Sequence, residues 1–190
     1  MPRRIEFYFY FTSPYSYLVS IQPVKTAAVS GAAVAGTPFR IAERMTLVGD
    51  RPTTIDCKNK DTYATADLGR WAGRYRVALQ RHATMWSFDD AIEAGRAADG
   101  VNAVFAAVWA EAVNLDERPV LIDLLDKADV DGTRLAESAA RADPAAGLEP
   151  YTAATAERGV FGSPTFFIDD QMFFGDDRLD FGAAAFAAAA

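Results

Sequence analysis

Residues 5–18 read IEFYFYFTSPYSYL, and this stretch decides the fold. Its first half, residues 5–11, is an aromatic run bounded by turn-forming residues, which is typical of a buried β-strand. A hydroxyl residue followed by Pro14 is typical of a helix start, because proline fits the first helical position. We therefore predict a strand over residues 5–11 and a helix over residues 14–29, with a kink at Pro23.

The middle of the chain changes from strand-like to helical sequence. Residues 34–41 are compatible with a second strand. Residues 45–63 are polar and rich in turn-forming residues, which predicts a loop. From residue 61 to residue 159, apolar side chains recur at helical spacing in alanine-rich segments, which predicts a block of helices.

The C-terminal part returns to strand-like sequence. Residues 163–168 and 171–174 predict two strands that form a hairpin around an Asp-Asp turn. A last helix is expected after Gly175, with Asp176 or Asp177 as its cap.

The resulting order is β-α-β, a helical block, then β-β-α. Without the helical block this is the layout of a thioredoxin fold, so we predict an α/β protein with a thioredoxin-like fold and a large all-helical insertion. The predicted domains are a discontinuous thioredoxin-like domain, residues 1–60 and 160–190, and an inserted helical domain, residues 61–159. An insertion of about 100 residues has the size of a domain.

Composition excludes several classes of protein. The chain has 190 residues, 51% of them hydrophobic and 24% charged, with a formal net charge of −7. It lacks the basic blocks of a nucleic-acid-binding protein and the apolar run of a membrane span, so we expect no nucleic-acid or membrane partner. Its single cysteine, Cys57, cannot form an intramolecular disulfide, and no secretory leader is apparent, so we expect a cytoplasmic protein. We assign no metal site.

The start of the first predicted helix is the candidate reactive site. In a thioredoxin fold this position stabilises anions, because the helix dipole and free backbone N–H groups point at it, and it usually carries Cys-x-x-Cys. Here Ser13 and Ser16 replace both sulfurs, which excludes disulfide exchange by the chain itself. A sulfur would then arrive on a ligand, and the Ser13 hydroxyl would donate a hydrogen bond to its thiolate and lower the pKa of the thiol. The competing interpretation, equally weighted, is that Ser13 is only a helix cap.

Two further motifs carry site signals. Pro164 would open a strand opposite the reactive helix, where this fold often has a cis peptide bond, and the backbone of Ser163 could then pair with an extended ligand. Asp176 and Asp177 could bind the α-amino group of a γ-glutamyl ligand. Taken alone, each motif is better explained by ordinary structure, an edge-strand proline in one case and helix capping in the other.

Taken together, these motifs resemble the family of 2-hydroxychromene-2-carboxylate isomerases and kappa-class glutathione transferases, which are relatives of the DsbA oxidoreductases. The resemblance rests on residues 11–18 (FTSPYSYL), residues 158–166 (RGVFGSPTF) and residues 174–179 (FGDDRL), supported by residues 67–72 (DLGRWA) and 108–111 (VWAE). It covers the chain to about residue 181.

The resemblance implies glutathione as cofactor and assigns the residues that hold it. Ser13 matches the position that hydrogen-bonds the glutathione sulfur. Ser163, before Pro164, matches the position whose backbone pairs with the cysteinyl part. Asp176 and Asp177 match the positions that hold the γ-glutamyl end.

The resemblance is weaker for the second substrate, a small aromatic carboxylate. Lys60 matches a lysine near the glutathione or the acidic substrate, Arg51 is the second candidate cation, and Tyr15 is a further candidate contact. Asp50 stands where relatives often carry Asn, which leaves its polar contact in doubt. The chain also departs from the family around residues 80–86, where His82, its only histidine, is more simply a surface or loop residue than a base.

Three functions follow as alternatives. In the first, a glutathione-dependent isomerase of aromatic-hydrocarbon breakdown, the thiolate adds to 2-hydroxychromene-2-carboxylate, the ring opens, a bond rotates and the thiol is expelled. In the second, a transferase, the thiol stays on the product. The third is a thiol- or peptide-binding module without catalysis. The resemblance also implies a homodimer.

Overall fold

The computed structural model describes residues 4–30, 33–39, 41, 45–46, 49–50, 57–80, 98–115, 117–141 and 153–188. The predicted site residues Arg51 and His82 lie outside these ranges. Of the predicted second strand, residues 34–41, the structure describes residues 34–39 and residue 41, and residue 41 is helical.

A four-stranded sheet in the order β2-β1-β3-β4 forms the centre of the molecule. Strand β1 (Arg4–Phe9) pairs in parallel with β2 (Ala33–Pro38) and antiparallel with β3 (Thr165–Ile168), which pairs antiparallel with β4 (Gln171–Phe174). Helix α1 (Pro14–Ser30) makes the crossover between the two parallel strands, as parallel pairing requires. The predicted thioredoxin-like arrangement is confirmed.

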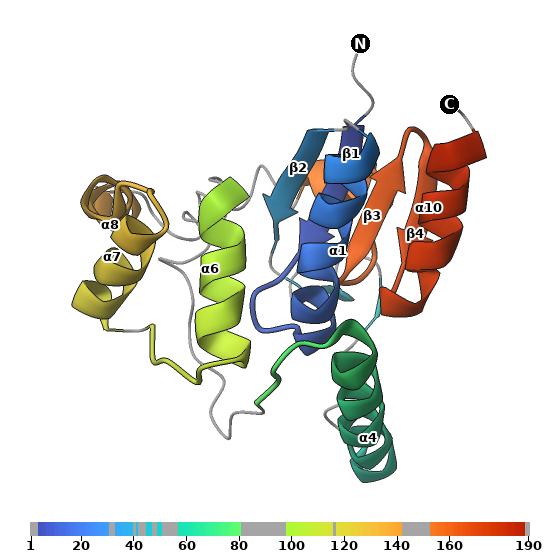
Figure 1. Ribbon diagram of the computed structural model, residues 1–190, viewed down its shortest axis with the longest axis horizontal. Helices are drawn as coiled ribbons and strands as arrows, with labels where there is room; N and C mark the ends of the chain where they lie inside the picture. The colour runs from blue at the N-terminus through green and yellow to red at the C-terminus, as the bar shows by residue number, and fades with distance from the viewer. Residues whose placement is uncertain are drawn as a thin grey trace.

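Helices cover one face of this sheet (Figure 1). α1 and α10 (Leu179–Ala188) lie in front of the strands, and α4 (Lys58–Tyr75) extends below α1. α6 (Ala98–Trp109) lies beyond β2, followed by α7 (Arg118–Lys127) and α8 (Gly132–Arg141). The predicted helical character of the insertion is confirmed over its described residues.

The alternation of side chains along β1 divides the core in two. Phe7 and Phe9 point to the helix-covered face, where they join a cluster with Leu18 of α1 and Phe105 of α6. Tyr8 points to the other face and packs with a smaller group, Phe39, Val160 and Phe167. This period of two is what a strand buried on both faces requires, and it explains the unbroken aromatic run in the sequence.

Several predicted boundaries are wrong. Strand β1 ends at Phe9, because the chain enters a turn at residues 11–12 before α1 begins. The predicted loop over residues 45–63 is helical at 45–46 and again from Lys58, where α4 begins. Neither Asp176 nor Asp177 caps α10, since both lie in the 3₁₀ turn η1 (Asp176–Arg178), whose N-cap is Gly175. Helix α1 is continuous across Pro23, and the kink expected there stays a prediction.

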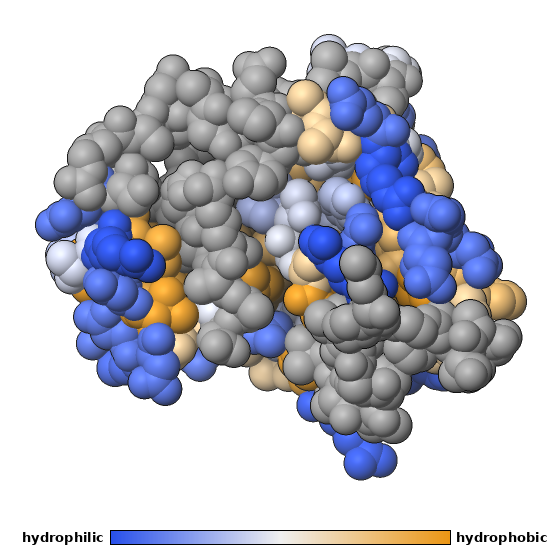
Figure 2. Space-filling view, turned by 90° about the horizontal axis from the view of Figure 1, so that it is seen from above, coloured by the Kyte–Doolittle hydropathy of each residue, from blue (hydrophilic) through white to orange (hydrophobic). Residues whose placement is uncertain are grey.

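The described surface is mostly hydrophilic when seen from above, with hydrophobic patches showing between the polar side chains (Figure 2). None of the described helices is both long enough and apolar enough to cross a lipid bilayer.

The close approach of α7 and α8 generates a stability prediction. A Cβ atom on Gly132 would lie 2.6 Å from the carbonyl oxygen and 2.9 Å from the Cα of Ile122, and both are backbone atoms that cannot rotate away. Gly132→Ala should therefore lower the free energy of unfolding by about 1–3 kcal/mol, as measured by urea denaturation.

Gly69→Ala is the matched control for this prediction. Gly69 lies inside α4, where nothing is within 4 Å of its Cβ position. Alanine there should be neutral or stabilising by up to about 1 kcal/mol. Equal stability of the two variants would contradict the packing argument.

Candidate active site

Ser13 occupies the N-terminal end of α1, as the sequence predicted. Its Oγ accepts a hydrogen bond from the backbone N–H of Ser16 at 3.2 Å, and its carbonyl oxygen accepts the N–H of Tyr17 at 3.1 Å. Ser13 is therefore an N-cap residue. Because the cap uses a lone pair of Oγ, the hydroxyl hydrogen is not consumed by this contact, and capping and donation to a ligand are compatible.

The loop before α1 is held by the inserted helices. The indole Nε1 of Trp109, in α6, donates to the carbonyl oxygen of Phe11 at 2.8 Å, two residues before Ser13. The hydroxyl of Tyr17 donates to the carbonyl oxygen of Ala78 at 2.7 Å. Trp109 and Phe105 are both buried and belong to the core.

The loop before β3 lies against the start of α1. The Ser163–Pro164 peptide bond is cis, the alternative that the sequence left open beside an ordinary edge-strand proline. The hydroxyls of Ser163 and Ser16 are 2.6 Å apart and share a hydrogen bond. The structure thus brings together the two ends of the chain that the sequence assigned to one site, although they are 147 residues apart.

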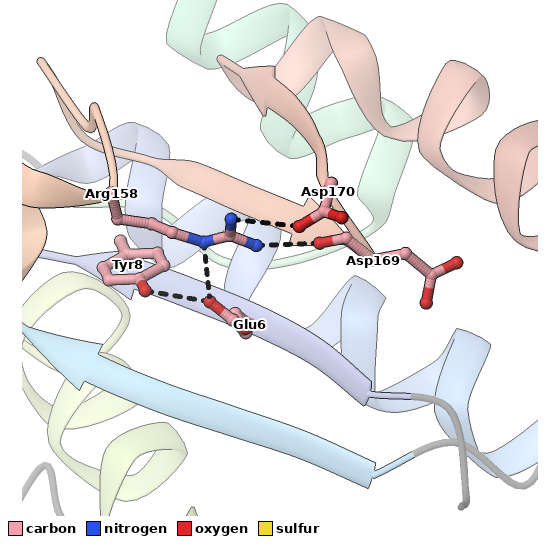
Figure 3. A network of polar contacts seen from close by, with 5 residues as sticks. All are labelled: Glu6, Tyr8, Arg158, Asp169 and Asp170. Carbon is pink, nitrogen blue, oxygen red and sulfur yellow. Dashed lines mark hydrogen bonds and ion pairs between the residues drawn. The ribbon is translucent and has the colours of Figure 1, made fainter.

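An ion-pair network holds the segment that leads into this loop (Figure 3). The guanidinium of Arg158 lies 3.5 Å from the carboxylate of Glu6 in β1 and 3.3 Å from that of Asp170, and it donates to the carbonyl oxygen of Asp169 at 2.8 Å. It also stacks 4.1 Å from the centre of the Phe167 ring. Arg158 therefore joins β1, the hairpin turn and the chain preceding Ser163.

Asp176 is a buried carboxylate with an unsatisfied oxygen. Its side chain is 7% exposed, and its Oδ2 has no hydrogen-bond partner. Burial, together with the nearby carboxylates of Asp177 and Asp67, raises the pKa of Asp176 to about 6, against backbone N–H groups that lower it. A buried acceptor without a donor is costly, which points to a ligand that supplies one.

A pocket of about 140 Å³ opens beside Asp176, between α1, α4 and α10. Its walls include three acids, one cation and two aromatic residues, namely Asp176, Asp177, Asp180, Arg74, Trp71 and Tyr75. The pocket suits a small ligand that carries a positive group and a carboxylate. The hydroxyl of Tyr75 donates to the backbone carbonyl of Asp176 at 3.0 Å and fixes this wall.

One face of α4 connects this pocket with the start of α1. Asp67, one turn before Trp71, accepts a hydrogen bond of 3.5 Å from the hydroxyl of Tyr15. Burial and the Asp67 carboxylate raise the pKa of Tyr15 to about 12, so the phenol stays protonated and acts as a donor. Lys60 is seven residues before Asp67, on the same face and about 10 Å further along the helix, and its side chain is exposed.

The structure does not bring every predicted residue into this group. Asp50 is exposed in a turn, where its N–H bonds to the carbonyl oxygen of Met45 at 2.7 Å. Cys57 precedes α4 and is half-buried. Among the residues that the structure describes, no three His, Cys, Asp or Glu side chains cluster as a metal site would need.

Sequence reasoning gave no role to Ser16, Asp67, Arg74 or Tyr75. One signal was available for Asp67 and Tyr75. Asp67, Trp71 and Tyr75 follow one another at intervals of four, which places them on one face of a helix. Trp71 and Tyr75 both pack against the main core cluster and line the pocket, so their spacing alone does not reveal the pocket.

Comparison with known proteins agrees with the fold. The DSBA-like thioredoxin domain model matches residues 4–187. The chain is 32% identical to the 2-hydroxychromene-2-carboxylate isomerase of Sphingobium xenophagum, covering 95% of this chain and 96% of that protein. It is 32% identical to the enzyme of the same name from Pseudomonas putida, covering 92% and 90%.

A solved structure gives the same result. The structure of a 2-hydroxychromene-2-carboxylate isomerase superposes with a TM-score of 0.89 at 29% identity, covering 98% of this chain and 95% of that one. The chain therefore belongs to the 2-hydroxychromene-2-carboxylate isomerase family of DsbA-like thioredoxin-domain proteins.

Proposed function

We propose that this isomerase acts on 2-hydroxychromene-2-carboxylate or a closely similar aromatic carboxylate, with glutathione as its cofactor. One observation carries the proposal: the helix start that this fold uses to stabilise a thiolate carries the Ser13 hydroxyl where a cysteine would be expected. The chain keeps the anion site and lacks the sulfur, so the sulfur is a ligand's.

The residues present fit glutathione. Asp176 has a buried carboxylate oxygen that lacks a donor, and the α-ammonium of a γ-glutamyl group would supply one. Arg74 lines the same pocket and offers a cation to the α-carboxylate of that group. Ser163 would pair through its backbone with the cysteinyl part, as the family resemblance implies. The thiol would then lie at the start of α1.

The chain's own groups would act as follows. Ser13 donates its hydroxyl hydrogen to the sulfur, which favours the thiolate. Tyr15, kept protonated beside Asp67, offers a second donor to an oxygen of the substrate. Lys60 supplies a cation for a carboxylate at the far end of α4. Glutathione, when bound, provides a nucleophile that adds to the substrate reversibly and is returned, so it is not consumed.

A turnover assay tests the reaction. Purified protein with 2-hydroxychromene-2-carboxylate and a small amount of glutathione should convert many substrate molecules per glutathione, while the free thiol concentration stays constant. Loss of free thiol with an aryl halide would indicate a transferase instead. Glutathione binding without either reaction would indicate a binding module.

The role of Ser13 can be separated from its role as a cap. Ser13→Gly keeps most of the stability of the N-cap, because glycine at this position costs only about a few tenths of a kcal/mol, but it has no hydroxyl hydrogen and introduces no charge. We expect a thermal midpoint close to that of the wild type and a loss of the thiolate absorbance that glutathione develops in the ultraviolet on binding.

A cap-only role for Ser13 predicts the opposite, since Ser13→Gly would then preserve thiolate absorbance. Ser20→Ala is a control in the same helix, because the Ser20 hydroxyl bonds only within α1, to the carbonyl oxygen of Tyr17 at 2.9 Å. This variant should keep the absorbance of the wild type.

Removing the charge of Asp176 should have opposite effects on the stability of the protein and on glutathione binding. Its folded-state pKa of about 6 lies above the ordinary value of 3.8, so the folded protein without ligand binds the proton more tightly and loses stability as pH rises from about 4 to 6. Asp176→Asn should therefore raise the free energy of unfolding at pH 7 by about 1–3 kcal/mol, while it weakens glutathione binding.

The ligand S-methylglutathione isolates this carboxylate, because it has no thiol to ionise. Its affinity for the wild type should fall as pH decreases through about 6, where Asp176 becomes protonated. Asp176→Asn should remove this pH dependence, and Asp180→Asn, at an exposed position of the same pocket, should retain it. An identical pH profile in all three proteins would contradict the assignment of Asp176.

A further inference from the structure

A hydroxyl pair joins two loops of the site. The Oγ atoms of Ser16 and Ser163 are 2.6 Å apart, although one serine lies in the first turn of α1 and the other precedes β3. Ser16 is completely buried, whereas Ser163 is partly exposed. Because Ser16 has no exposed surface, its side chain cannot touch a ligand from solvent in this conformation.

Ser16 contacts both residues that the proposed function places at the thiol. Its backbone N–H donates to Ser13 Oγ at 3.2 Å, and its own hydroxyl bonds to Ser163 Oγ. We propose that Ser16 is a positioning residue that fixes Ser163 relative to Ser13, and so sets the width of the space in which the cofactor's cysteinyl part binds. This role rests on the proposed function.

The hydrogen-bond partner of the Ser16 hydroxyl supports this role. A serine inside a helix usually bonds back to a carbonyl three or four residues earlier, as Ser20 does with Tyr17 at 2.9 Å. Ser16 is in the same helix but is paired with a residue from the other end of the chain. A buried hydroxyl paired across two segments fixes their separation, because losing either partner leaves the other unsatisfied.

Other contacts hold the Ser163 loop without fixing it to α1. The carbonyl oxygen of Pro164 accepts the N–H of Gly175 at 3.0 Å, which ties the loop to the hairpin. The hydroxyl of Thr165 donates to the carbonyl oxygen of Gly162 at 2.7 Å, which ties the loop to itself. The contact with Ser16 adds the link to the reactive helix.

A double-mutant cycle tests the proposal. Glutathione dissociation constants would be measured by calorimetry for the wild type, Ser16→Ala, Ser163→Ala and the double variant. We expect each single substitution to raise the dissociation constant about 5- to 30-fold. The dissociation constant of the double variant should be about the same as that of whichever single variant binds less tightly. Effects that multiply would overturn the pairing.

A second readout separates positioning from general damage. Ser16→Ala keeps the backbone N–H that bonds to Ser13, so the pKa of the bound thiol, followed by thiolate absorbance at saturating glutathione, should equal that of the wild type. Ser20→Ala should change neither affinity nor absorbance. A changed thiol pKa in Ser16→Ala, or an unchanged dissociation constant, would overturn the role.

The outcomes also separate this role from the proposed function. Ser163→Ala removes the contact from the loop side, so the test does not depend on Ser16→Ala folding. If the wild type binds glutathione and the cycle shows no coupling, only the role of Ser16 is overturned. If the wild type does not bind glutathione, the proposed function is overturned and this role with it.

Discussion

The hydrogen bond from the Trp109 indole to the Phe11 carbonyl is the contact on which the site depends. Strand β1 ends at Phe9, so the next residues leave the sheet and their backbone groups lose strand partners. A buried carbonyl without a donor is costly, and α6 supplies that donor. The turn before α1 closes on itself through the Ser13 N–H and the Tyr10 carbonyl oxygen at 3.0 Å, and the Trp109 indole ties this turn to the inserted helices.

The same relationship recurs around the site. Tyr17 bonds to Ala78, Tyr15 to Asp67, and Tyr75 to the backbone of Asp176, and each pair joins the thioredoxin-like part to the insertion. Tyrosine suits this task, because it buries an apolar ring and offers one directed donor at its tip. Tyr15 and Tyr17, in the motif that begins at Ser13, thus hold the two parts of the molecule together.

The sequence was sufficient for the fold because its strongest signals are local. Each of these signals determines the local structure of a few residues: the aromatic run over residues 5–11, the hydroxyl before Pro14 and the Asp-Asp turn. Their order along the chain matches one arrangement of strands and helices, that of the thioredoxin fold. Strand and helix ends were less predictable. Whether Phe11 extends a strand or enters a turn is settled by Trp109, which is 98 residues away, and no local pattern reports that contact.

The candidate site, like the fold, could be predicted from the sequence only in part. Ser13 and the Ser163–Pro164 pair were recognisable because the fold gives those positions a fixed chemistry. The pocket beside Asp176 was not, because it needs side chains from three separate helices, and Trp71 and Tyr75 have the same spacing whether they line a pocket or fill a core. Burial distinguishes the two cases, and burial is a property of the folded chain.

The outer edge of the sheet has a consequence for solubility. Strand β4 ends the sheet, and Met172 and Phe174 on it are 41% and 43% exposed, a combination that invites edge-to-edge association between molecules. Acidic pairs bracket the strand, Asp169-Asp170 before it and Asp176-Asp177 after it. Two copies pairing antiparallel would bring the first pair of one near the second pair of the other, but much of this charge is balanced, because Asp170 lies 3.3 Å from Arg158, Asp177 lies 2.9 Å from Arg178 and Asp176 is buried. Acidic residues at its two ends therefore do not by themselves protect this edge, and a charged side chain at Met172 or Phe174 would be the direct way to keep copies of the protein from pairing along it.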